Sequence, residues 1–268
     1  MTRRGRHFST TGSRLRTEPF APADLSRDAF LGGRLEIAQP RAGYRAGIDP
    51  VLLAAAVPAQ AGETLLDLGC GAGVAALCVA ARVPGVRLAG LEMQPAYAAL
   101  ACENAAHNGA EMEVLTGDVA AMPAALRQRQ FDHVIANPPY FDRGAGTPAA
   151  DAGREGALGE AVPLADWIAA ALRRCRPGGH VCVIHRAERL ADLLAAMRGS
   201  VEVLPLIPRR GRAARLVLVR ARKGGRAGLR LCDGWLLHEG PRHAGDGENL
   251  TRSTASVLRD ASPLPFCR

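Results

Sequence analysis

The sequence contains no apolar run of the roughly 20 residues that a membrane-spanning helix requires. The longest run near its start, VLLAAAV at Val51–Val57, is far too short. Residues 1–16 are basic, contain no acid and include no apolar segment of the kind found in secretory signals. We therefore expect no membrane association. We interpret residues 1–28 as a basic flexible arm that is either plainly disordered or in contact with phosphates.

The sequence also lacks paired cysteine motifs. Its seven cysteines are odd in number and scattered, without any C-x-x-C: Cys70, Cys78, Cys102, Cys175, Cys182, Cys232 and Cys267. This pattern predicts reduced thiols in a cytoplasmic protein and argues against a zinc site. The histidines show no metal-ligand spacing either, so we expect no bound metal.

Lysine is almost absent, because Lys223 is the only lysine among the 34 basic residues. The net charge of +8 favours an acidic partner such as RNA or DNA, although such a charge also aids solubility. With 48% hydrophobic residues, the 268-residue chain can bury one large core. We expect one large domain, without internal repeats, that acts as a monomer.

From Glu63 onward, short apolar runs alternate with alanine-rich helical stretches, which is the pattern of βαβ units around a parallel sheet. The expected strands are Thr64–Gly69, Val86–Glu92, Met112–Asp118, Phe131–Asn137, Gly179–His185, Val201–Ile207 and Ala214–Arg222. The last two have no long helical pattern between them and should pair as an antiparallel hairpin. The predicted fold is α/β: a doubly wound, Rossmann-like, mostly parallel seven-stranded sheet with an antiparallel edge hairpin and a short N-terminal extension.

The chain is predicted to have four parts along its length. After the arm, residues 29–60 form an N-terminal capping segment, residues 61–225 form the core, and residues 226–268 form a C-terminal extension packed on or trailing the core. Within the core, the Gly- and Ala-rich stretch Asp142–Ala161 is interpreted as a long loop, of a length that is usually functional or disordered.

The stretch LLDLGCGAG, Leu65–Gly73, lies between a predicted strand and a helical run. Glycines in such a turn let the backbone approach a ligand closely. A dinucleotide fingerprint, G-x-G-x-x-G, requires a third glycine where Val74 stands, so NAD binding is disfavoured. The candidate cofactor contacts in this turn are Asp67, Gly69, Cys70, Gly71 and Gly73.

Acids lie on three consecutive predicted strands, at Asp67, Glu92 and Asp118. Because the carboxyl ends of parallel strands meet at one edge of a sheet, these acids should converge on one crevice. Carboxylates accept hydrogen bonds from ribose hydroxyls and an adenine amine, and they favour a nearby positive charge. S-adenosylmethionine carries all of these groups, and we add Met93 and Val119, which follow two of the acids, to its candidate contacts.

Together, LDLGCGAG, the acid of GLE, TGD and NPPY resemble a class I S-adenosylmethionine-dependent methyltransferase. NPPY resembles the motif of amino-methylating enzymes that act on adenine or glutamine nitrogens. Residues 30–264 are further similar to the bacterial tRNA1(Val) adenine-37 N6-methyltransferase family, through FLGGRLEIAQPRAGYRAGIDPVLLAAAVPA, NPPYF, RPGGHVCVIHRAERLADLLAAM and EVLPLIPRRGRAARLVLVRARKG. In that family the segment around Gly47 and Asp49 lies beside the cofactor. From its position before Pro50 alone, Asp49 is instead a helix cap.

The chemistry accounts for the composition of NPPY. An exocyclic adenine amine is a poor nucleophile because its lone pair is delocalised into the ring. The Asn137 side-chain carbonyl and the Pro138 backbone carbonyl can each accept one N–H and orient the lone pair toward a sulfonium methyl. Pro138 and Pro139 keep the turn out of the sheet ladder, and Tyr140 offers a face on which a base can stack. The candidate catalytic residues are Asn137, Pro138, Pro139 and Tyr140; the alternative is a strand that simply ends at prolines.

The stretch Arg209–Arg230 is rich in arginine and contains no acid. Such a run is often only a solvated face, but on one hairpin it favours phosphate contact. The candidate RNA contacts are Arg209, Arg210, Arg212, Arg215, Arg222 and Lys223. His185, at a strand end, is interpreted as a packed residue.

The resemblance implies direct in-line methyl transfer to the N6 amine of an adenine in tRNA, next to the anticodon. Four alternatives remain: a glutamine N5-methyltransferase of release factors, a ribosomal RNA or a DNA amino-methyltransferase, and a catalytically silent RNA-binding module. The release-factor enzymes carry a helical N-terminal domain, which the short basic segment before Leu65 does not resemble, and the basic hairpin favours RNA.

Overall fold

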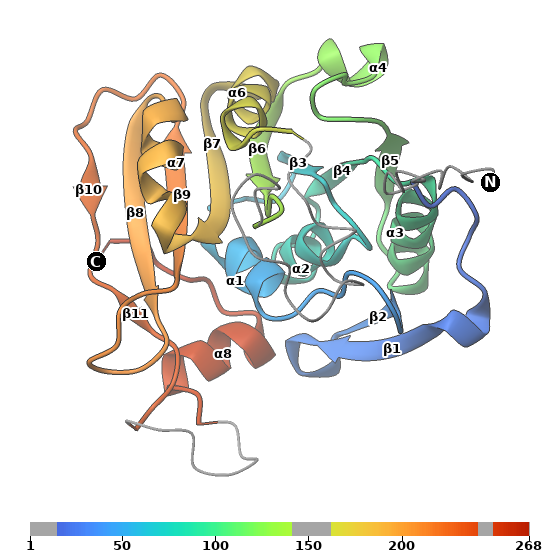
Figure 1. The fold of residues 1–268 in the computed structure, drawn as a ribbon, viewed down its shortest axis with the longest axis horizontal. Coiled ribbons are helices and arrows are strands. Elements are labelled where there is room, and N and C mark those ends of the chain that lie inside the picture. Colours follow the sequence, from blue (N-terminus) through green and yellow to red (C-terminus); the bar gives the residue numbers. More distant parts are fainter. Residues whose placement is uncertain (1–14, 141–161, 241–248, 268) are drawn as a thin grey trace, which may run out of the picture.

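A computed structural model describes residues 15–140, 162–240 and 249–267 of the chain (Figure 1). Five strands of its central sheet run parallel: β3 (Thr64–Leu68), β4 (Arg87–Glu92), β5 (Met112–Thr116), β6 (Phe131–Ala136) and β7 (Cys175–Arg186). β9 (Leu216–Arg222) lies antiparallel between β7 and β8 (Ser200–Ile207), so the order is β8-β9-β7-β6-β3-β4-β5. The predicted mostly parallel sheet with an antiparallel hairpin is confirmed.

The sheet is larger than predicted, with nine strands in its described part instead of seven. β10 (Arg230–Leu231) and β11 (Trp235–Leu236) both pair in parallel with β8 and cover its outer side. Each is only two residues long, so neither produces a periodic pattern from which sequence could predict it. The hairpin of β8 and β9 is therefore not a bare edge.

Helices cover both faces of the sheet, as a doubly wound fold requires. They are α1 (Asp49–Ala56), α2 (Val74–Arg82), α3 (Pro95–His107), α4 (Ala124–Arg127), α6 (Leu164–Arg174), α7 (Leu190–Ala196) and α8 (Arg252–Asp260), with short 3₁₀ turns at Pro22–Asp24, Leu31–Gly33 and Ala187–Arg189. Neighbouring residues of β3 face opposite ways: Leu65 packs with α1 and α2, and Leu66 with α6. Both faces are therefore apolar. No helix in the described ranges is long and apolar enough to cross a membrane.

Ahead of the core, β1 (Leu25–Phe30) and β2 (Leu35–Pro40) form a separate antiparallel hairpin. In Figure 1 it lies beside α8, below α2 and α3. Part of the predicted flexible arm, residues 25–28, thus belongs to a strand, while residues 1–14 lie outside the described part. The sequence did not reveal the hairpin because the burial of β1 alternates only weakly.

Two asparagines, Asn104 in α3 and Asn108 directly after it, fasten this hairpin to the core. Asn104 accepts the N–H of Ala38 at 2.8 Å and donates to its carbonyl at 3.0 Å, and Asn108 makes the same pair of bonds to Glu36, both at 2.9 Å. Side-chain amides thus replace a neighbouring strand along β2. Asn104 also donates to the carbonyl of Ala72 at 3.0 Å, which joins the hairpin to the glycine-rich turn after β3.

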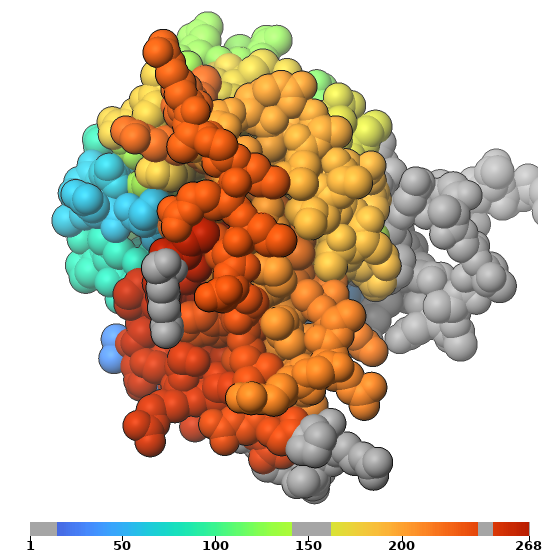
Figure 2. Space-filling model, turned by 90° about the vertical axis from the view of Figure 1, so that its left-hand side faces the viewer, coloured from blue at the N-terminus to red at the C-terminus, as the bar shows by residue number. Residues whose placement is uncertain are grey.

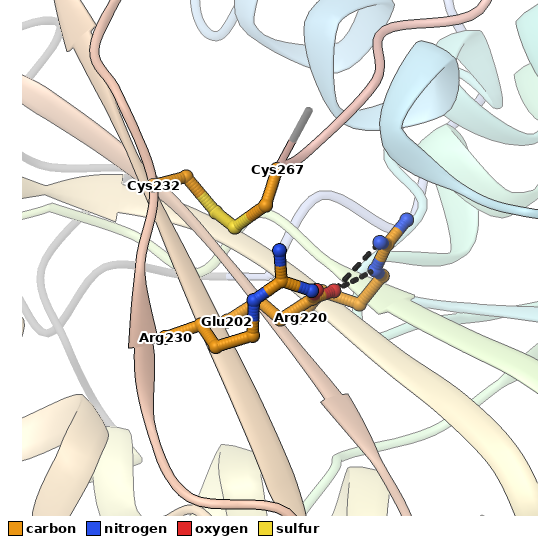
Figure 3. The surroundings of a disulfide bond; sticks show 5 residues. All are labelled: Glu202, Arg220, Arg230, Cys232 and Cys267. Carbon is orange, nitrogen blue, oxygen red and sulfur yellow. Dashed lines mark hydrogen bonds and ion pairs between the residues drawn. A yellow bond between two sulfur atoms is a disulfide. The ribbon is translucent and has the colours of Figure 1, made fainter.

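The C-terminal residues return to the outer side of the sheet, where Cys232 and Cys267 form a disulfide with a Cα–Cα distance of 5.0 Å (Figure 3). The expectation that all seven cysteines are reduced is wrong for this pair. Spacing along the chain could not predict it, because the two residues meet only after the tail has folded back. Figure 2 shows this face as a continuous surface of the last strands and the C-terminal segment.

Candidate active site

A cavity of about 630 Å³ opens at the carboxyl ends of the parallel strands. Its volume is in the range of small-molecule sites, roughly 300–1,000 Å³. Every predicted cofactor or catalytic residue except Gly73 lines it: Asp49, Asp67, Gly69, Cys70, Gly71, Glu92, Met93, Asp118, Val119, Asn137, Pro138, Pro139 and Tyr140. The fold thus gathers residues from four successive strand ends and from the segment before α1 around one space.

The glycines of the turn after β3 have different structural roles. Gly69 has a φ of +69°, and a β-carbon there would lie 2.7 Å from the ring of Trp167 on α6, so no larger residue fits. Gly71 has a φ of +54° and faces the cavity. Gly73 is not among the cavity-lining residues; it caps the start of α2 with a φ of +85°, and a β-carbon there would lie 3.4 Å from the Cβ of Ala101.

Two acids are buried side by side in the cavity wall. Burial raises the pKa of Asp67 to about 8, with a further contribution from the nearby Glu92 carboxylate. The Oδ2 atom of Asp67 receives no hydrogen bond from any described residue. Burial also raises the pKa of Glu92, although its two oxygens accept the N–H groups of Gly71 and Gln94, each at 2.9 Å. Such a pair favours a ligand that carries hydrogen-bond donors and positive charge.

The third acid, Asp118, is less deeply placed. Its Oδ1 atom accepts the N–H of Ala120 at 2.8 Å, so the carboxylate also shapes its own loop after β5. Val119, next to it, is buried and lines the cavity, as does Met93, which is 39% exposed. The two residues add apolar surface to the lining of the cavity.

The NPPY turn follows β6 at the rim of the cavity. The Oδ1 atom of Asn137 is buried and has no hydrogen-bond partner among the described residues. A buried acceptor without a partner is costly, by about 1–3 kcal/mol, and it marks a position at which a ligand can donate. Phe141 and the predicted loop Asp142–Ala161 lie outside the described residues.

Tyr140 is held from two sides. Its hydroxyl donates to Asp49 Oδ2 at 2.6 Å, and its ring meets that of His185 edge-on, with 5.2 Å between centroids. Ile48, not Asp49, occupies the cap position of α1, so the capping role is wrong: Asp49 begins the helix and its carboxylate binds Tyr140. His185 is fully buried, which lowers its pKa to about 4, and it accepts the N–H of Arg186 at 2.9 Å. It is a packed residue, as its position suggested.

Known proteins share this arrangement. The methyltransferase small-domain family model matches residues 46–205, which include most of the cavity lining and most of the sheet. The chain belongs to the methyltransferase small-domain family. It is therefore an S-adenosylmethionine-dependent methyltransferase, as the motifs predicted.

Curated relatives of this methyltransferase are tRNA1(Val) (adenine(37)-N6)-methyltransferases. One from Yersinia enterocolitica is 33% identical over 137 residues, and the match spans 50% of this chain and 53% of that protein. One from Porphyromonas gingivalis is 33% identical over 178 residues, spanning 63% of this chain and 69% of that protein. The chain thus spans between about half and two thirds of the length of these relatives.

Solved structures agree with the fold. A protein described as a predicted O-methyltransferase, from Agrobacterium tumefaciens, is 28% identical with a TM-score of 0.63, over 82% of this chain and 99% of that one. A Thermus thermophilus 16S rRNA N2 G1207 methyltransferase, solved with AdoMet and guanosine, has a TM-score of 0.53 at 21% identity, over 74% of this chain and 50% of that one. The second likeness concerns the fold alone.

The residues of the cavity fit the cofactor of this methyltransferase. The turn at Gly69 and Gly71 lets a ligand approach the backbone, and the unpaired oxygen of Asp67 can accept from a cationic group. Glu92 retains acceptor capacity for hydroxyl groups, since each carboxylate oxygen can accept two hydrogen bonds. Among the described residues, no group of three or more potential metal ligands comes together.

Three aromatic residues of the cavity, Tyr44, Tyr97 and Trp167, were missed from the sequence. Tyr44, in the loop before α1, packs its ring against Gly71, and its carbonyl accepts the Tyr97 hydroxyl at 3.1 Å. Trp167 of α6 lines the cavity and lies against Gly69. The stretch GYRAGID carries a signal for Tyr44, an aromatic residue between glycines. Trp167 gave none, because only folding brings α6 to this turn.

The predicted RNA contacts fall into two groups at opposite edges of the sheet. Arg209, Arg210, Arg212 and Arg215 lie in the turn between β8 and β9, at the cavity edge. Arg222 and Lys223 end β9 at the other edge, where Arg222 donates to the Gly178 carbonyl at 3.4 Å and Lys223 to that of Cys175 at 2.7 Å. A strand of seven residues separates the groups by about 20 Å.

Proposed function

We propose that this methyltransferase methylates the N6 amine of an adenine in tRNA. The observation that carries the proposal is the buried, unpartnered Oδ1 of Asn137 at the rim of the cofactor cavity. An acceptor at this place fits a nucleophile that carries N–H groups. It does not suit a hydroxyl or a carbon acid, which needs a general base.

The chain's own residues bind and orient the amine. Asn137 Oδ1 and the Pro138 carbonyl each accept one of its hydrogens, so that the nitrogen lone pair points into the cavity. S-adenosylmethionine supplies an electrophilic methyl group on a positive sulfur. The amine nitrogen forms the new N–C bond as the C–S bond breaks, and it then releases one proton to solvent. Held geometry, not proton removal before attack, provides most of the rate.

Three observations support an RNA substrate. The curated relatives carry the name of tRNA adenine methyltransferases. The basic turn between β8 and β9 lies at the same edge of the sheet as the cavity. Arg186, at the end of β7, lies over the ring of Tyr140, 5.8 Å from its centroid, and so continues the basic surface to the cavity mouth. A role in tRNA modification would place the protein in the cytoplasm.

The test is methylation of total tRNA from a strain that lacks the gene, followed by mass spectrometry of nucleosides. We expect N6-methyladenosine in one tRNA species. Asn137→Ala should lower the transfer rate by about 10²–10³-fold, because the reacting amine then has one acceptor fewer. Calorimetry should show unchanged affinity for S-adenosylmethionine in the variant.

Glutamine N5-methylation of a release factor is the second candidate, since a side-chain amide presents a similar planar amine to Asn137. The same enzyme is incubated with a release factor and the peptides are analysed for methylglutamine. Methylglutamine together with unmodified tRNA would overturn the tRNA proposal and leave the role of Asn137 intact.

A further inference from the structure

The direction of the Tyr140 ring matters for the proposed reaction. A base that stacks on this ring takes its orientation from it, and a displacement of about 1 Å can cost a large part of the rate. Pro138 and Pro139, directly before Tyr140, have no N–H groups with which to bond to a neighbouring strand. The ring must therefore be fixed mainly by contacts of its own side chain.

Those contacts come from α1 and from the end of β7. The Tyr140 hydroxyl donates to Asp49 Oδ2 at 2.6 Å. The ring of His185 meets the Tyr140 ring edge-on, with 5.2 Å between centroids and 67° between planes. The guanidinium of Arg186 lies over the ring, 5.8 Å from its centroid, which leaves the other face for a base.

We propose that Asp49 is a positioning residue for the substrate: by holding the Tyr140 hydroxyl, it fixes the ring on which the reacting base stacks. This role differs from the cofactor contact that the family resemblance implied for Asp49. It also connects α1, which precedes the glycine turn, with a residue 91 positions further along the chain.

Asp49 is well placed to act as a fixed point. It is the first residue of α1, and all the residues after it in this helix, Pro50–Ala56, are buried. Pro50 has a restricted φ, and the N–H of Leu52 donates to the Ile48 carbonyl at 3.0 Å, so the helix start is well defined. A carboxylate in the first turn is also stabilised by the helix dipole.

The opposite side of the ring is equally firm. His185 is fully buried, and its Nδ1 atom accepts the N–H of Arg186 at 2.9 Å, which fixes the orientation of the imidazole. Its strand, β7, lies between β6 and β9 in the interior of the sheet. Tyr140 is thus held between a buried helix start and a central strand, neither of which can easily move away.

The protons of this pair have defined places. Burial, with the nearby Asp49 carboxylate, raises the pKa of Tyr140, so the hydroxyl stays protonated and donates. Burial also raises the pKa of Asp49, and the hydrogen bond from Tyr140 opposes this shift by stabilising the ionised carboxylate. Because the hydroxyl proton is already engaged, Tyr140 offers the substrate its ring and not a proton.

Asp49→Ala and Tyr140→Phe remove the bond from its two ends. We expect each to lower kcat on tRNA about 10-fold, since the base is held less firmly. The KM for tRNA should change by less than about twofold, because phosphate contacts elsewhere dominate RNA binding. The double variant should be no slower than the slower single variant, since one bond can be lost only once. Asp49→Asn keeps an oxygen that accepts from the hydroxyl and should recover most of the rate.

Three results would overturn the inference. Losses that multiply in the double variant, to about 100-fold, would mean that Asp49 acts independently of Tyr140, as a cofactor contact does. A Tyr140→Phe enzyme with the kcat of the wild type would show that the hydroxyl is not needed. Equal losses in Asp49→Asn and Asp49→Ala would show that the accepting oxygen is not what matters.

Nuclear magnetic resonance tests the bond without tRNA. Tyrosine labelled with ¹³C at Cζ should give three signals, because the chain has three tyrosines, and Tyr140→Phe identifies the signal of Tyr140. Asp49→Ala should move this signal, since the hydroxyl loses its acceptor. The Tyr97 signal is the internal control, because its hydroxyl donates to the Tyr44 carbonyl at 3.1 Å. A Tyr140 signal at the same position in wild type and Asp49→Ala would refute the bond.

The inference rests on the proposed amine methylation, but the two fail differently. A wild-type enzyme that methylates neither tRNA nor a protein amide refutes the proposed function, whatever the resonance experiment shows. A wild-type enzyme that methylates an amine and is indifferent to the bond between Asp49 and Tyr140 refutes only the positioning role of Asp49.

Discussion

At the scale of single residues, the cavity buries two carboxyl groups, and removing them from water disfavours their charged forms. Asp67 is 3% exposed and Glu92 is 8% exposed, and burial raises the pKa of both. With a pKa of about 8, Asp67 is largely protonated at neutral pH in the free protein. A cationic ligand stabilises its ionised form, so binding and ionisation of Asp67 are coupled.

We therefore expect binding of S-adenosylmethionine at pH 7 to release a large fraction of one proton, and binding at pH 9 to release almost none. Calorimetry in phosphate and in Tris, which differ in ionisation enthalpy, measures this release. Asp67→Asn should abolish the difference between the buffers. Equal binding enthalpies in both buffers at pH 7 for the wild type would contradict the coupling.

The same carboxyl affects the stability of the free protein. Since its pKa in the folded state lies above the ordinary value of 3.8, the folded state binds more protons than the unfolded state between these values. The contribution of Asp67 to the free energy of unfolding is full below pH 4 and is lost as pH rises toward 8. Bound cofactor should reduce this loss.

At the scale of elements, α1 links the active site to the C-terminal tail. It begins with Asp49 in the cavity, and its last carbonyls have partners from distant segments. Arg82 donates to Ala54 and Val57, the Leu264 N–H donates to Ala55 at 2.8 Å, and Arg220 donates to Ala56 at 3.3 Å. The orphan carbonyls at the helix end are thus satisfied by the core and by the tail.

The disulfide holds this tail in place. Arg220 and Arg230 both pair with Glu202 near it (Figure 3). Arg220 also lies over the ring of Phe266, 4.2 Å from its centroid. The crosslink has a sequence separation of 35 residues, for which loop-closure entropy amounts to about 3–4 kcal/mol.

Cys267→Ser should accordingly lower the free energy of unfolding by about 3–4 kcal/mol, measured in urea without reductant. Reductant should lower that of the wild type to the same value and leave the variant unchanged. Cys102→Ser, at an exposed free thiol, is the control and should have no effect. If Cys267→Ser matches the wild type in the absence of reductant, the pair does not form in solution.

At the scale of the whole molecule, the basic side chains differ in how available they are to bind phosphate. Arg222 and Lys223 bind backbone carbonyls at the edge away from the cavity. Arg209 donates to the carbonyl of Glu239, so it also has a structural partner. Arg210, Arg212 and Arg215 are exposed in the turn on the cavity edge, which makes them the best candidates for phosphate contact.

Replacing Arg210, Arg212 and Arg215 by Gln should weaken tRNA binding and lower the slope of log K against log salt by about one unit for each phosphate that is no longer neutralised. Fluorescence anisotropy across a series of KCl concentrations measures both. Arg222→Gln with Arg226→Gln, on the opposite edge, is the matched control and should change the slope much less. If both sets of substitutions changed tRNA affinity and its salt dependence equally, tRNA binding would depend on the net charge of the protein and not on the position of these arginines.

Much of the fold could be predicted because its signals are local. The runs at Leu65 and Val134 are apolar, β-branched or leucine-rich and are followed by helical stretches, and parallel strands necessarily bring their carboxyl ends to one edge. The convergence of Asp67, Glu92 and Asn137 on one cavity follows from that topology. The hairpin of β1 and β2 did not follow, since its edge is completed by Asn104 of α3 and by Asn108, directly after that helix.

The sequence by itself determined the core sheet, the glycine turn, the acids and the NPPY rim, because each is encoded within one short stretch whose pattern has a direct physical cause. Only the tertiary structure decided the Cys232–Cys267 pair and the contact of Trp167 with Gly69. These depend on segments that are far apart along the chain. Their distances are set by how helices and loops pack on the sheet, and no local pattern records that packing.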